Sequence, residues 1–156
     1  MSDQWRRVEE GNLYQSDLDS IKELSIQESI KSIDNIDKLE NLKRLNIYTN
    51  TIKTLEPLKN CKNLEYLDIR ADNISDLSAI NKLPKLNSLH LINMPINTLE
   101  SIGNLPSLET LDLYNLNITN LNGIENIKSL KKIYVIRKVN DISALSKLTN
   151  LEEITL

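Results

Sequence analysis

One histidine stands midway between two aspartates in the sequence, with Asp68, His90 and Asp112 spaced 22 residues apart. An imidazole beside two carboxylates could hold a metal ion or exchange protons with a substrate, if the fold brought them together. The neighbouring Ser88 and Thr110 have no recognisable base, orienting group or oxyanion-binding arrangement. We therefore predict a charged surface trio with no catalytic residue, no bound metal and no cofactor. A metal-dependent enzyme at this trio is the remote alternative.

A second set of residues has the composition of a protein-binding surface. Four of the five tyrosines lie, with one arginine and two isoleucines, at positions that recur along the chain. Tyrosine and arginine beside apolar residues are typical of interface hot spots. The preference of tyrosine for strands explains part of this pattern, but not the isoleucines that share its positions. The predicted partner-binding residues are Tyr48, Tyr66, Arg70, Ile92, Tyr114, Tyr134 and Ile136.

An internal repeat sets the spacing of all these candidates. A hexad of the form apolar-x-x-apolar-x-apolar occurs seven times, at intervals of 21 or 22 residues. Within one repeat, the alternation of Leu67 and Ile69 predicts a short strand with one buried face. The apolar residues that follow, Ile74, Leu77 and Ile80, step by three, which favours 3₁₀ turns over a long α-helix. The hexads begin at Ile21, Leu42, Leu64, Leu86, Leu108, Leu130 and Leu151.

Stacking of these units predicts one domain with a continuous core. A single unit cannot bury its own apolar edge, so its neighbours must cover it. Because every unit runs in the same direction, the strands are expected to be parallel, with alternate residues facing solvent. We predict an N-terminal cap over residues 1–17 and a solenoid of seven strand units over residues 18–156, the last unit truncated. The apolar residues assigned to the cap are Trp5, Val8, Leu13 and Tyr14.

This spacing resembles that of the leucine-rich repeat, in the short 22-residue version found in internalins. The resemblance covers residues 18–156 and rests on the seven registered hexads. It implies an α/β repeat fold, a curved solenoid with parallel strands on its concave face and 3₁₀ or irregular segments on its convex face. It also implies that the concave face binds a protein partner and that the repeats themselves carry no catalysis.

Two features of this sequence depart from the pattern of that family. The family usually has asparagine at the ninth position of each repeat, where Asn50, Asp72, Met94 and Leu116 stand here. The frequent phenylalanine spine is also missing, since the chain contains no phenylalanine. We therefore expect apolar contacts to replace most of the polar ladder between turns, with the fold preserved.

Composition limits the kinds of partner and the compartment. A net charge of −3 and a pI near 5.3 argue against a broad nucleic-acid footprint, which needs a basic face. The single cysteine, Cys61, occupies a leucine position, so we expect it to be buried packing rather than a disulfide or metal ligand. The chain lacks a secretory signal and a membrane-length apolar run, which predicts a cytoplasmic protein. A surface protein trimmed of its signal and anchor remains an open alternative.

The predicted function is thus a non-enzymatic protein–protein interaction module that regulates or neutralises a partner. A second class is a structural protein that self-assembles through the final strand, whose edge is unpaired if nothing follows it. The chain is expected to be a monomer or a weak homo-oligomer, and a fragment of a longer protein would look the same. Its many Asn, Ile and Lys residues suggest a bacterial source.

Overall fold

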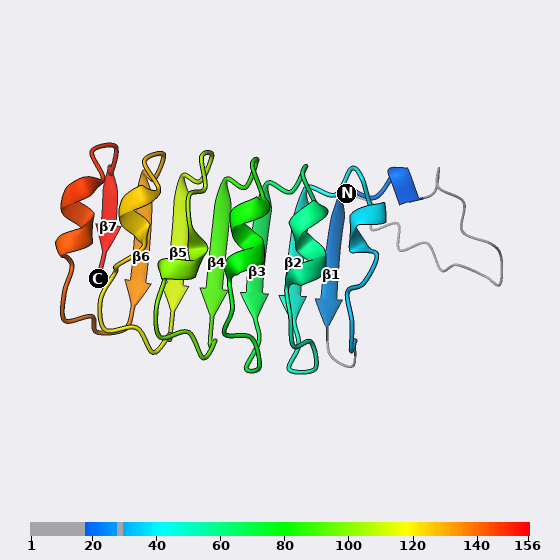
Figure 1. Ribbon diagram of the computed structural model, residues 1–156, viewed down its shortest axis with the longest axis horizontal. Helices are drawn as coiled ribbons and strands as arrows, with labels where there is room; N and C mark the ends of the chain where they lie inside the picture. Colours follow the sequence, from blue (N-terminus) through cyan, green and yellow to red (C-terminus); the bar gives the residue numbers. More distant parts are fainter. Residues whose placement is uncertain (1–17, 28–29) are drawn as a thin grey trace, which may run out of the picture.

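Parallel strands form one continuous sheet through the described part of the protein (Figure 1). The computed structural model describes residues 18–27 and 30–156. Within these residues the sheet has seven strands in the order of the sequence, so each repeat lies beside the repeat before it. The strands are β1 Glu23–Gln27, β2 Arg44–Tyr48, β3 Tyr66–Arg70, β4 Ser88–Ile92, β5 Thr110–Tyr114, β6 Lys132–Ile136 and β7 Glu153–Thr155.

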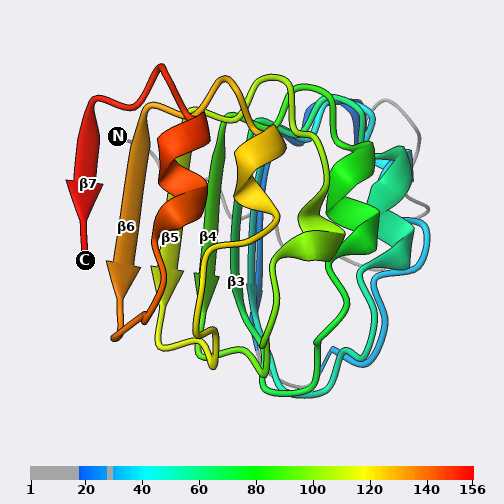
Figure 2. The ribbon, with the colours of Figure 1, turned by 60° about the vertical axis from the view of Figure 1, so that its left-hand side comes forward.

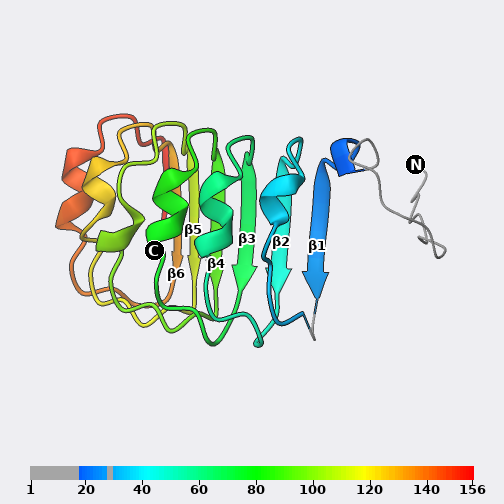
Figure 3. The ribbon, with the colours of Figure 1, turned by 45° about the vertical axis from the view of Figure 1, so that its right-hand side comes forward.

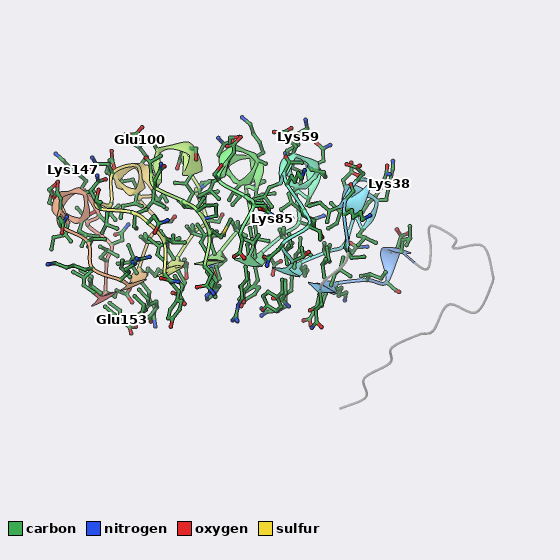
Figure 4. The ribbon with its side chains drawn as sticks, turned by 90° about the horizontal axis from the view of Figure 1, so that it is seen from below. Lys38, Lys59, Lys85, Glu100, Lys147 and Glu153 are labelled. Carbon is green, nitrogen blue, oxygen red and sulfur yellow. The ribbon has the colours of Figure 1, made fainter. Side chains whose placement is uncertain are left out.

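Short 3₁₀ helices form a second layer behind the sheet (Figure 2). The predicted steps of three residues are confirmed as 3₁₀ turns, and Pro57 lies in the first turn of η2, where it costs no hydrogen bond. The row of strands forms the inner side of a shallow arch and the 3₁₀ layer its outer side (Figure 4). These helices are η1 Ile36–Lys38, η2 Glu56–Asn60, η3 Ser78–Lys82, η4 Glu100–Ile102, η5 Ile124–Asn126 and η6 Ser143–Lys147.

The core lies between these two layers. Leu67 and Ile69 point into it from β3, and Ile74, Leu77 and Ile80 close it from the returning segment, all with 0% exposure. Each such side chain contributes roughly 1.5–3 kcal/mol by leaving water. The other repeats place equivalent leucines and isoleucines in the same layer, so the predicted continuous core is confirmed.

The equal repeat lengths fix the register between strands. Residues 22 apart are direct cross-strand partners from β2 to β6, as in the row Arg70, Ile92, Tyr114 and Ile136. Alternate residues of each strand therefore form columns that cross the inner face of the arch. A one-residue slip would turn every buried leucine outward, which is why the register is strongly specified.

The ninth position of the repeat takes two different environments. Met94 and Leu116 are buried, at 2% and 1% exposure, which confirms that apolar contacts replace the polar ladder in the fourth and fifth repeats. Asn50 and Asp72 are exposed instead, and the Asn50 Oδ1 atom accepts a hydrogen bond of 3.2 Å from the Asp72 N–H. The second and third repeats thus keep one polar contact between them at this position, the hydrogen bond from the Asp72 N–H to Asn50.

The backbone conformation of the eighth residue of the repeat, just before this position, accounts for the two environments. Asn93 and Asn115 adopt left-handed conformations with φ of 54° and 53°, which asparagine tolerates better than most residues. In these two repeats the next side chain enters the core. In the second and third repeats the eighth residue itself is buried, as Thr49 at 3% and Ala71 at 0% exposure.

A different polar ladder connects the turns that precede the strands. At five of the hexads, the residue just before the hexad bonds a backbone carbonyl of the previous repeat, whereas Lys85, before the fourth hexad, donates to the Asn63 side chain. Successive coils are thus connected at this edge. The side chains of Asn41, Asn63 and Asn150 donate across 2.9, 2.8 and 2.7 Å to the carbonyls of Asp19, Glu40 and Lys128. Ser107 and Ser129 make equivalent bonds through their hydroxyl groups.

The two ends of the solenoid differ from its middle. Figure 3 brings forward the end of the sheet that carries β1. An apolar groove near this strand is lined by Leu18, Leu24, Ile26 and Ile33 among others. The cap predicted over residues 1–17 lies outside the described residues, so it stays a prediction. At the other end, β7 leaves Ile154 at 49% exposure. Assembly through this strand also stays a prediction.

Candidate functional site

Three columns of side chains project from the inner face of the sheet, and the predicted binding residues lie in them. In the first column Tyr66 lies beside Ser88, and in the second Asp68 lies beside His90. None of the seven predicted residues is buried, and Tyr114 and Ile136 are the most exposed large apolar members, at 46% and 45%. For these seven residues, the alternation in the sequence thus separates buried from accessible positions correctly.

Arginine–tyrosine stacking organises the part of the face on β2 and β3. The Arg44 guanidinium carbon lies 3.9 Å from the centre of the Tyr66 ring, and that of Arg70 lies 5.0 Å from the Tyr48 ring. Such cation–π contacts contribute about 0.5–1 kcal/mol at exposed sites. They restrict the movement of both tyrosine rings.

A hydrogen bond also holds Tyr48. Its hydroxyl donates to the Asp68 Oδ2 atom over 2.7 Å. Burial of the phenol, together with this bond to a carboxylate, raises the pKa of Tyr48 to about 12. The Tyr66 pKa is raised as well, mainly by burial. Both phenols are therefore neutral donors at physiological pH.

Asp68 departs from the expected exposure of its column. Its side chain lies on the inner face as predicted, yet its relative exposure is 7%. One carboxylate oxygen is bonded to Tyr48, and the other, Oδ1, is buried without a hydrogen-bond partner in the described part of the protein. The prediction of a solvent-exposed carboxylate was wrong here, because cross-strand neighbours cover it.

His90 lies between the two aspartates in the strand register, as the spacing predicts. Its Nε2 atom shares a hydrogen bond of 2.8 Å with the Ser88 hydroxyl, and its Nδ1 atom lies 3.4 Å from Asp112 Oδ2. The ring also lies 5.0 Å from that of Tyr66. Among residues 18–27 and 30–156, no group of three or more His, Cys, Asp or Glu side chains is placed to hold a metal ion. The geometry is that of a surface hydrogen-bond network.

Apolar side chains form a ridge on the part of the face from β4 to β6. Ile92, Tyr114 and Ile136 are direct neighbours on three adjacent strands, and we call these three residues the apolar ridge. Ile92 is half-buried, whereas the other two are exposed. Tyr134 lies in the next column, where a hydrogen bond with Glu153 raises its pKa. The ridge therefore offers apolar surface that no residue of the described chain covers.

Sequence reasoning missed Arg44, which belongs to the same face. The signal was present, because Arg44 and Tyr66 occupy the same column of adjacent strands and are 22 residues apart. Opposed residues in a column touch across a sheet, so the pair could have been read from spacing alone. The bond between Tyr48 and Asp68 is diagonal, 20 residues apart, and spacing does not single it out.

Two further expectations concern the rest of the chain. Cys61 is confirmed as buried packing, at 6% exposure, and burial raises the pKa of its thiol to about 11. In the described residues, every helix is too short or too polar to cross a membrane.

Comparisons with known proteins give matches among solved structures. No protein-family model matches the sequence, and no curated protein matches it. An internalin (inlF) from Listeria monocytogenes superposes with a TM-score of 0.69 and 28% identity, over 91% of this chain and 49% of that one. This chain therefore spans about half the length of that internalin.

Two other structures extend the comparison. Internalin C2 from the same organism gives a TM-score of 0.69 at 21% identity, over 92% of this chain and 84% of its own. A chain of the mouse RP105/MD-1 complex gives 0.52 at 18% identity, over 78% of this chain and 27% of its own. Both likenesses concern the fold.

The parallel strand row, the 3₁₀ layer and these likenesses together define a leucine-rich-repeat solenoid. More particularly, repeats of 21 or 22 residues make this solenoid similar to those of the internalins.

Proposed function

We propose that this protein is a non-enzymatic interaction module that binds a folded protein partner through the concave face of its solenoid. The observation that carries the proposal is the apolar ridge, which is aligned on three adjacent strands and has two exposed members, Tyr114 and Ile136, in the described chain. Occupation of the partner's surface would regulate or neutralise it. The proposed contacts are Tyr48, Tyr66, Arg70, Ile92, Tyr114, Tyr134 and Ile136.

Preorganisation is the physical basis of the proposed binding. The strands are fixed by the sheet, and stacking with Arg70 and Arg44 fixes the rings of Tyr48 and Tyr66. Side chains that are already ordered lose little conformational entropy on docking, a cost of roughly 0.5–1.5 kcal/mol for each freely rotating side chain. A rigid aromatic face therefore suits a partner that is itself folded.

The comparison with the RP105/MD-1 complex supports a protein as the partner, since a chain of this fold forms part of a protein complex there. Large apolar and aromatic side chains on an open face are also the usual composition of protein interfaces. The electrically mixed inner face, in which Lys132 lies 3.1 Å from Glu153, lacks the basic stripe of a nucleic-acid site.

A pull-down from the source cell tests the proposal. The bait is the full chain, compared with a variant that carries Tyr48→Ala and Tyr114→Ala. A matched control carries Lys59→Ala and Glu100→Ala on the outer face (Figure 4). We expect the inner-face variant to lose a partner that the wild type and the control both capture. Equal capture by all three proteins, each shown to be folded by circular dichroism, would contradict binding through the concave face.

A further inference from the structure

The carboxylate of Asp112 lies in the middle of the concave face, beside the apolar ridge. Its charge influences which chemical groups a partner can place there. Asp112 lies on β5, two residues before Tyr114, so both side chains emerge on the same side of the strand. Its side chain is 29% exposed, and His90 Nδ1 is its near partner, at 3.4 Å from Oδ2. Asp112 Oδ1 has no hydrogen-bond partner in the described residues.

Asp68, a buried residue on β3, adds a second carboxylate next to His90 on the concave face. The Asp68 side chain is buried, with 7% exposure. Its Oδ1 atom also has no hydrogen-bond partner in residues 18–27 and 30–156. Buried polar atoms in native proteins are rarely left without partners. Asp68 and Asp112 flank His90 in the register, and in each the buried oxygen Oδ1 has no hydrogen-bond donor among the described residues. Of the two, only Asp112 keeps a partly exposed side chain, at 29%.

The cations of the inner face are already engaged elsewhere. Arg44 lies 3.7 Å from Glu23, and Lys132 lies 3.1 Å from Glu153. Arg70 lies over the ring of Tyr48. The inner-face residues of β4 and β5 include no lysine or arginine; they are Ser88, His90, Ile92, Thr110, Asp112 and Tyr114. On β4 and β5, beside the ridge, the inner face therefore carries the Asp112 carboxylate without a lysine or arginine of these two strands.

We propose that the partner places a lysine or arginine side chain against Asp112 and an apolar side chain on the ridge. Residues two apart on a strand lie about 6.6–6.8 Å from each other, which sets the spacing between the partner's basic and apolar groups. The guanidinium or ammonium group donates to the Asp112 carboxylate, and its charge also offsets that of the buried Asp68. This inference rests on the proposed function and specifies the chemistry of the partner.

Selection from a random 12-residue peptide library displayed on phage tests the inference, and it does not require the natural partner to be identified first. The full chain is the target, and the enriched peptides are synthesised as probes. Their affinities are then measured for the wild type, for Asp112→Asn, for Tyr114→Ala and for Glu100→Gln. The last variant removes a carboxylate from the outer face and serves as the matched control (Figure 4).

We expect the enriched peptides to share a basic residue with an apolar residue near it. Their affinity should fall about tenfold or more with Asp112→Asn, because a charged partner is left without its counterion, and stay unchanged with Glu100→Gln. Peptides that depend on Tyr114 but lack a basic residue and ignore Asp112→Asn would overturn this inference and leave concave-face binding intact. Peptides that ignore both Tyr114→Ala and Asp112→Asn would overturn both proposals.

Discussion

The two halves of the concave face use the same columns of the repeat in different ways. On β2 and β3, Tyr48 is hydrogen-bonded to Asp68 and stacked under Arg70. On β4 to β6, the ridge residues Tyr114 and Ile136 have large exposed fractions, 46% and 45%. In the first half the tyrosine side chains are stabilised by their neighbours, whereas in the second Tyr114 and Ile136 face open solvent.

This difference shows that the position of a residue in its column predicts which way its side chain points. It does not predict whether that side chain stabilises the fold or contributes to binding. Exposed apolar area stabilises a complex when a partner covers it, while the same area in the free protein contributes nothing to folding. A satisfied hydrogen bond to a buried carboxylate acts in the opposite way, because it stabilises the folded chain alone. We therefore expect the β2–β3 half to serve mainly stability and the β4–β6 half mainly binding.

The largest expected effect is the loss of partner affinity when the ridge is truncated. Combined Tyr114→Ala and Ile136→Ala should weaken binding by about 2–4 kcal/mol, because central apolar and aromatic anchors dominate interface energies. The free energy of unfolding should change by only about 1 kcal/mol for the two substitutions together, since each exposed site contributes about 0.5 kcal/mol. Calorimetric titration with the partner and urea unfolding measure the two quantities. A variant that unfolds more easily but binds normally would reverse the assignment.

Removal of the Tyr48 hydroxyl should act on stability. Tyr48→Phe leaves the buried Asp68 carboxylate without its donor, and we expect the free energy of unfolding to fall by about 1–3 kcal/mol. Tyr134→Phe is the control. Because Tyr134 is hydrogen-bonded to the exposed Glu153, removal of its hydroxyl should lower the free energy of unfolding by less. Equal losses for the two variants in urea unfolding would show that burial of Asp68 has no energetic weight.

A smaller effect is expected from the stacked pair Arg44 and Tyr66. Arg44→Met keeps the aliphatic stem and removes the charge over the ring, which should cost about 0.5–1 kcal/mol. A double-mutant cycle with Tyr66→Leu isolates the contact from the effects of each residue elsewhere. A coupling energy indistinguishable from zero would mean that the stacking does not fix the ring.

The smallest effect appears only at high pH. The pKa of Tyr48 is about 12 in the folded protein, above its ordinary value of 10.0, because burial and the Asp68 carboxylate disfavour the phenolate. The folded state thus holds this proton more tightly than the unfolded state. The resulting stabilisation is complete below pH 10.0 and is lost as the pH rises toward 12. The difference in unfolding free energy between wild type and Tyr48→Phe should shrink over this range, and a constant difference would contradict the pKa shift.

Much of the fold follows from the sequence because the repeat length is nearly constant. Equal spacing fixes the parallel register, and the alternation of Leu67 and Ile69 with their polar neighbours fixes which face is buried. The step of three residues after each strand excludes a long helix and predicts the 3₁₀ layer. These are local patterns repeated along the chain, so each repeat supports the interpretation of the others.

The details that escaped prediction depend on side-chain contacts and single backbone angles. The left-handed conformation of Asn93 decides that Met94 enters the core, yet Asp72 at the same position as Met94 stays outside. The burial of Asp68 depends on how Tyr48 reaches across from the adjacent strand. Neither is encoded in the period of the repeat, because both depend on which particular side chains meet.

Photo-crosslinking from single positions tests the central claim most directly. A photoreactive amino acid replaces Tyr114 or Ile136 on the inner face, or Lys59 or Glu100 on the outer face, and each protein is irradiated in extract of the source cell. If the concave face is the binding surface, one partner is crosslinked from positions 114 and 136 and not from positions 59 and 100. Crosslinks to that partner from positions 59 and 100 alone would contradict the account.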